Sequence, residues 1–71
     1  MNIENTILIL EKMLREAELN SRTKLAEYEY LALTLGDYKS SADCGFSESI
    51  ERVNALKEAI QACQLVNDEL S

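Results

Sequence analysis

The residues that interrupt helices are confined to one short stretch of this chain. The 71 residues include no proline, and the two glycines, Gly36 and Gly45, both lie near the middle. Proline and glycine are the strongest interruptions of an α-helix, so the segments on either side can each be continuous helix. The sequence therefore predicts an all-α fold, an antiparallel helical hairpin in which a long helix, a polar loop and a second helix follow one another. Residues 1–71 are expected to form a single domain.

The first helix is expected over about residues 3–35, because apolar residues recur along it in steps of three and four. This first stripe consists of Ile3, Ile7, Leu10, Leu14, Ala17, Tyr28, Leu31 and Leu35. Ser21 and Lys24 occupy the two positions that would complete it, so the helix is weakest there. With no proline or glycine to stop it, we expect the helix to continue or bend through Ser21. The alternative is a break near Ser21 that gives a third short helix.

A polar loop is expected over residues 36–46 and a second helix over residues 47–70. Gly36 follows the last residue of the first stripe, where a glycine adopts the left-handed conformation that ends many helices. Ser47 is placed to cap the second helix. The second helix also has an apolar stripe, whose mean step is below 3.6 residues and favours supercoiling against a partner helix. Its members are Phe46, Ile50, Val53, Leu56, Ile60, Cys63, Val66 and Leu70.

A second set of apolar residues lies on the opposite side of the first helix. At about 100° per residue, these side chains share one face. An ordinary surface helix has one apolar face, and the second helix of a hairpin can cover only one side of the first. We therefore predict that this second set binds another protein, unless a break near Ser21 buries it in a three-helix fold. The set consists of Leu8, Leu19, Ala26, Tyr30 and Leu33.

Composition and charge argue against several classes of function. The 13 acidic and 7 basic residues give a net charge of −6, which disfavours nucleic-acid binding. The chain has no histidine, and Cys44 and Cys63 lie far apart, so we expect no metal site. No motif indicates a cofactor or a catalytic group, and we expect a non-enzymatic protein. The longest aliphatic run, residues 7–10, is far shorter than the ~20 residues of a membrane span. No signal peptide is apparent. We therefore expect a cytoplasmic protein with reduced cysteines.

The stretch from Ser49 to Val66 resembles the second helix of the small E-type co-chaperones of type III secretion needle subunits. Leu56 to Ile60 match a Leu-x-x-Ala-Ile core in that helix, and Leu10 and Leu14 lie in a similar Glu-rich first helix. The loop that begins at Gly36 departs from the family pattern. The resemblance implies a bacterial cytoplasmic protein that binds and stabilises a TPR-like co-chaperone. Through that partner, it would help to keep the needle subunit monomeric before export.

Two other interpretations stay open at the level of sequence. The acidic balance also suits a small phage-type inhibitor that docks on a basic surface of a host enzyme, and such binding would weaken strongly with salt. The heptad-like spacing also suits a self-assembling coiled coil, in which the protein alone forms a homo-oligomer. In every case the expected activity is binding to another protein chain.

Overall fold

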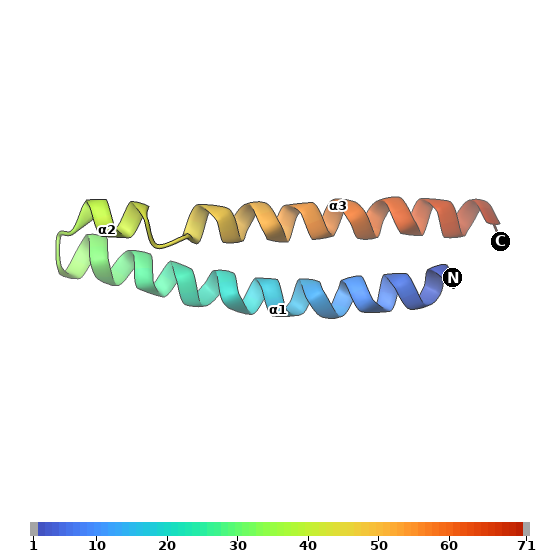
Figure 1. Cartoon of the computed structure of the whole chain (residues 1–71), viewed down its shortest axis with the longest axis horizontal. Helices are drawn as coiled ribbons and strands as arrows, with labels where there is room; N and C mark the ends of the chain where they lie inside the picture. The colour runs from blue at the N-terminus through green and yellow to red at the C-terminus, as the bar shows by residue number, and fades with distance from the viewer. Residues whose placement is uncertain (1, 71) are drawn as a thin grey trace.

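The fold is a rod made of two long antiparallel helices (Figure 1). The computed structural model describes residues 2–70, and this part of the chain contains helices and no strand. Helix α1 (Ile3–Glu29) passes into a π-helical turn, η1 (Tyr30–Thr34), which is followed by a short helix α2 (Tyr38–Ala42) and by α3 (Phe46–Leu70). The rod measures 53 × 15 × 14 Å. The predicted all-α hairpin is confirmed.

Helix α1 runs through Ser21 without interruption, so the alternative of a third helix created by a break at Ser21 is wrong. Asn2 caps its start, where the Glu4 backbone N–H donates to Asn2 Oδ1 at 2.9 Å. Within the weak region, the Thr23 hydroxyl donates to the Leu19 carbonyl oxygen at 3.2 Å. Such bonding to the preceding turn satisfies the hydroxyl inside a helix, so this polar stretch does not need to leave the helical conformation.

The last turn of the first helix is wider than predicted. The Leu35 N–H donates to the Tyr30 carbonyl oxygen at 3.1 Å, five residues back, as in a π-helix. The extra residue in this turn shifts the packed face, so that Ala32 is buried at 2% exposure and Leu35 is 58% exposed. The prediction that Leu35 belongs to the packed stripe is therefore wrong. Gly36 ends the turn with φ +69°, as its position predicted.

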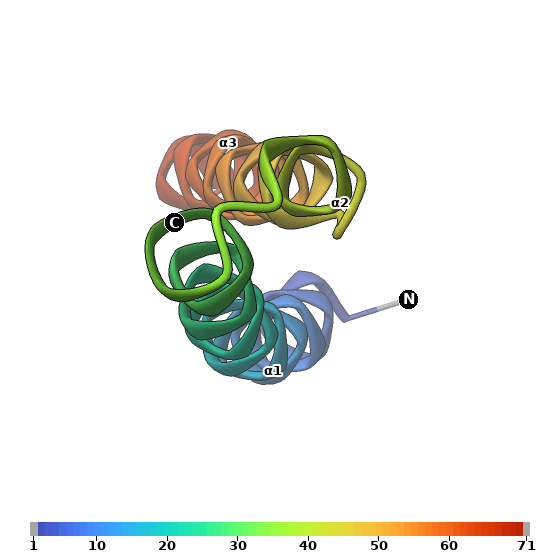
Figure 2. The ribbon, with the colours of Figure 1, turned by 90° about the vertical axis from the view of Figure 1, so that its left-hand side faces the viewer.

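The segment predicted as a loop over residues 36–46 contains helix α2, so that prediction is wrong in part. Asp37 caps α2, because its Oδ1 accepts a hydrogen bond from the Ser40 N–H at 3.0 Å. Ser41 is buried, and its hydroxyl donates to the Tyr38 carbonyl oxygen at 2.8 Å. Helix α2 packs against η1 and stands in line with α3, as the view from the loop end shows (Figure 2). Small polar residues are typical of loops, but here they form one capped helical turn.

Helix α3 begins one residue earlier than predicted, at Phe46. Gly45 precedes it with φ +90°, and its carbonyl oxygen accepts from the Ser49 N–H at 3.0 Å. The predicted cap, Ser47, lies within the first turn and is exposed. The Phe46 ring instead packs against the ring of Tyr28, with 5.7 Å between centroids. This aromatic contact joins the start of α3 to the end of α1.

The core between α1 and α3 is narrow and contains small residues. The buried apolar residues of this seam are Ala17, Leu56 and Ile60. On α3 the packed face follows a strict heptad through two polar residues, and its buried and half-buried members are Ser49, Val53, Leu56, Ile60, Cys63 and Asn67. Ile50, Val66 and Leu70, which were predicted to belong to the packed stripe, are exposed. The stripe was misplaced because Ser49 and Asn67 carry no apolar signal.

No helix within the described residues is both long enough and apolar enough to cross a membrane.

Candidate interaction surface

The five residues predicted to bind a partner all lie on the solvent-facing side of the hairpin. Leu8, Leu19, Tyr30 and Leu33 are 62, 65, 55 and 75% exposed, and Ala26 is also exposed. No element of the described chain covers them. Scattered apolar residues are normal on a protein surface, whereas a row of large ones along one helix indicates a binding face.

Three basic residues share this face with the apolar row. Lys12, Arg15 and Arg22 fall at the heptad positions between Leu8 and Ala26, and all three are exposed. Only Lys24 is ion-paired within residues 2–70, through Nζ to Glu27 Oε2 at 3.4 Å. We name as the outer face of α1 the residues Leu8, Lys12, Arg15, Leu19, Arg22, Ala26, Tyr30 and Leu33.

The outer face of α1 is slightly hollowed near its middle. A shallow depression there is lined by Arg15, Glu18, Leu19 and Arg22. Two guanidinium groups thus stand beside an exposed leucine. Guanidinium groups bind carboxylates in a bidentate geometry, so this part of the face suits an apolar helix that also carries acidic side chains.

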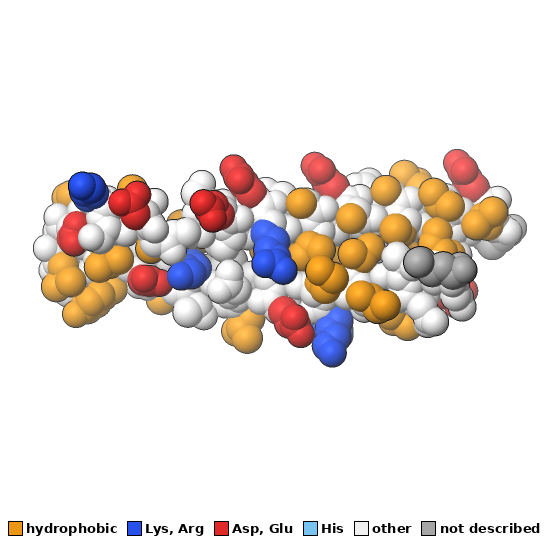
Figure 3. Space-filling view, in the orientation of Figure 1, with side chains coloured by type: hydrophobic (Ala, Val, Ile, Leu, Met, Phe, Trp, Pro, Cys, Tyr) orange, Lys and Arg blue, Asp and Glu red, His pale blue; other side chains and the backbone are white. Residues whose placement is uncertain are grey.

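The hairpin tip adds apolar surface that the sequence did not assign to binding. Leu35 and Tyr38 are exposed beside Tyr30 and Leu33 of the outer face. Hydrophobic side chains gather over this end of the rod (Figure 3). The π-helical turn exposes Leu35, and no simple sequence periodicity predicts such a turn.

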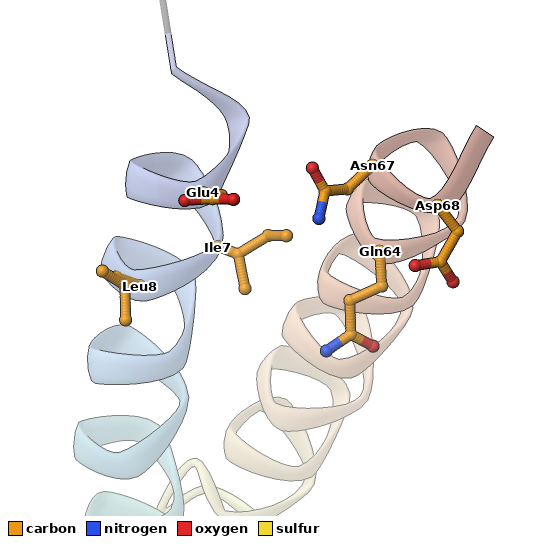
Figure 4. A pocket seen from close by; sticks show the side chains of 6 residues that line it. All are labelled: Glu4, Ile7, Leu8, Gln64, Asn67 and Asp68. Carbon is orange, nitrogen blue, oxygen red and sulfur yellow. The ribbon is translucent and has the colours of Figure 1, made fainter. Parts of the chain in front are cut away.

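The other end of the rod has an open hollow between the two helices (Figure 4). It has a volume of about 500 Å³ and is lined by residues 4, 7 and 8 of α1 and by Gln64, Asn67 and Asp68 of α3. Leu8 borders this hollow, so the outer face of α1 begins at its rim. The lining mixes amide, carboxylate and aliphatic groups.

The carboxyl group of Asp37 has a lowered pKa, and both cysteine thiols are free. The Ser40 backbone N–H and then its hydroxyl hydrogen-bond to the carboxylate of Asp37 and lower the pKa of that group below its ordinary value. Cys44 and Cys63 are free and half-buried, and Cys44 Sγ lies 3.8 Å from the Lys24 carbonyl oxygen. No group of three or more metal-ligating side chains comes together among residues 2–70.

No family model, curated protein or solved structure matches this chain.

Proposed function

We propose that this hairpin is a non-enzymatic interaction protein whose outer face of α1 binds a larger helical partner. The observation that carries the proposal is the exposed row of Leu8, Leu19, Tyr30 and Leu33 on a continuous helix. A helix that docks in an apolar groove uses anchors spaced by three, four and seven residues. From Leu19 to Leu33 the row has such spacing, with steps of seven, four and three through Ala26 and Tyr30, and Leu8 lies eleven residues before Leu19.

The resemblance to the E-type co-chaperones supports a more specific partner. A TPR array is a stack of helix pairs whose end exposes a helical face that needs capping. We propose that the hairpin binds such an array in the bacterial cytoplasm and stabilises it, while the array holds a type III secretion needle subunit as a monomer. A standard interface takes about 800 Å² from each partner. The hairpin exposes 5420 Å² in total, so one long face is large enough.

The small core of the hairpin also favours a function in the bound state. Small helical chains commonly gain stability from a partner, because a ligand that binds only the folded form stabilises it by mass action. Among the described residues, the large side chains that are buried in the seam between α1 and α3 are Leu56 and Ile60, both from α3. Covering the outer face of α1 would remove further apolar surface from water.

Coexpression with a TPR-type chaperone of a needle subunit tests this proposal. We expect Leu8→Glu, Leu19→Glu and Leu33→Glu each to lower co-purification of the TPR chaperone, because each places a charge where the partner's apolar surface should lie. Leu65→Glu is the matched control, since Leu65 is 59% exposed, close to the 65% of Leu19, but lies on α3. Circular dichroism should show that all four variants stay helical. Wild-type co-purification by all three α1 variants would exclude this surface.

A further inference from the structure

We propose that, without another partner, the outer face of α1 binds the outward side of α3 from a second copy of this chain. This inference does not depend on the TPR partner, and it adds a second helix face, that of α3, to the outer face of α1. It rests on a match in charge and spacing between the two exposed faces.

The outward side of α3 is acidic and has small or apolar residues between its charges. It lies opposite the buried Leu56 and Ile60, and all its members are exposed. We name as the outer face of α3 the residues Glu48, Glu51, Ala55, Glu58, Ala62, Leu65, Val66 and Glu69. This face has no lysine or arginine, whereas the outer face of α1 has three basic residues and one acidic neighbour, Glu18, in its depression.

The charges on the two outer faces have the same spacing. Lys12, Arg15 and Arg22 are separated by three and then seven residues, and Glu48, Glu51 and Glu58 are separated by three and then seven. If the two helices lie parallel with Lys12 beside Glu48, the two arginines fall beside Glu51 and Glu58. Opposite charges matched in this way set the partner and the register of helix pairs.

In the same register three apolar residues of the outer face of α1 meet small or apolar residues, whereas Leu33 falls beside Glu69 and Leu8 lies beyond the start of α3. Leu19 then lies beside Ala55, Ala26 beside Ala62, and Tyr30 beside Val66. Pairing a large side chain with a small one across two helices lets them interdigitate. Ala55 and Ala62 leave room for the leucine and arginine side chains of α1. A second copy therefore supplies both the acidic groups and the shallow apolar surface that the outer face of α1 requires.

The basic and acidic side chains that this contact would use are available. Lys12, Arg15, Arg22, Glu51 and Glu58 take part in no ion pair between residues of the described range.

The two outer faces point away from each other across the hairpin. The contact is therefore heterologous, and each added copy leaves one face of each kind open, so association continues beyond a dimer.

Sedimentation velocity on the full chain tests this inference. We expect the wild type to associate in a concentration-dependent way at about 0.05 M salt and to dissociate at about 0.5 M, because the Debye length shortens several-fold. Arg15→Glu/Arg22→Glu and Glu51→Lys/Glu58→Lys should each lose association at a concentration where the wild type associates. Mixing these two variants should restore it, since the basic α1 face of one then meets the acidic α3 face of the other.

The control is Lys39→Glu/Lys57→Glu, which changes the net charge as much as Arg15→Glu/Arg22→Glu does, at exposed positions outside both faces. It should keep wild-type association. A wild type that stays monomeric at low salt would overturn the inference, as would a mixture of the two charge variants that stays monomeric. Glu51→Lys/Glu58→Lys leaves the outer face of α1 intact. It should still co-purify with a TPR chaperone, so the inference and the proposed function can fail separately.

Discussion

The stability of the hairpin should depend on a few side chains in the seam between α1 and α3, and Leu56→Ala tests this most directly. Leu56 is 9% exposed and lies at the centre of the packed face of α3. The substitution removes three buried carbon groups at about 0.8 kcal/mol each, which amounts to about 2.4 kcal/mol before any cavity forms. Leu56 keeps 9% of its surface exposed in a seam between only two long helices, so its neighbours can partly collapse into the space, and we expect a total near the lower end of the roughly 2.7–5 kcal/mol range of buried leucines.

This loss is large for so small a domain. At roughly 0.05–0.15 kcal/mol per residue, a chain of this length is stable by only about 4–10 kcal/mol. The corresponding fall in melting temperature is about 10–20 °C. The assay is thermal and urea unfolding followed by circular dichroism, in dilute protein at high salt so that association does not contribute.

Leu65→Ala provides the comparison, because Leu65 is on the same helix and 59% exposed. Its effect should stay within about 0.5 kcal/mol. If Leu56→Ala and Leu65→Ala unfold at the same temperature, the seam does not hold the hairpin together and our account of the core is refuted.

Two further predictions concern the turn region. Gly36→Ala should destabilise the hairpin by about 1 kcal/mol in urea unfolding even though a Cβ would meet no atom within 4 Å, because the φ of +69° disfavours a side chain; an unchanged unfolding midpoint would contradict this. The pKa of the Asp37 carboxylate lies below its ordinary value of 3.8. The ionised carboxylate should therefore stabilise the fold above pH 3.8, and this contribution should be lost as the pH falls through the lowered pKa. In Asp37→Ala, the melting temperature should fall less on acidification than it does in the wild type.

The two proposed contacts use one surface in different ways. Both a TPR-like partner and a second copy of the chain would cover the outer face of α1, so they would compete for it. Self-association would then cover Leu19 and Tyr30 until the partner is available. Charge should dominate the contact between copies, whereas apolar burial should dominate the contact with a groove, so salt should shift the balance toward the partner.

The sequence by itself determined the all-α hairpin and favoured a first helix that continues through Ser21, and the structure excluded the alternative break that would have buried the second face of α1. These features follow from local chemistry. Helix breakers are absent outside residues 36–45, and helical periodicity places Leu8, Leu19, Ala26, Tyr30 and Leu33 on one side. The left-handed conformation of Gly36 also follows from local chemistry, because glycine has no Cβ.

Only the tertiary structure decided which residues line the seam near the tip and along α3. Because of the π-helical turn, Ala32 is buried and Leu35 is exposed, the reverse of what the spacing predicted. The capped helix α2 occupies a segment that was predicted as a loop. Both depend on how η1 and α2 pack together, which no periodicity within one segment reveals. The packed face of α3 likewise passes through Ser49, whose hydroxyl donates to the Phe46 carbonyl oxygen, and through Asn67, which lines the open hollow between the helices.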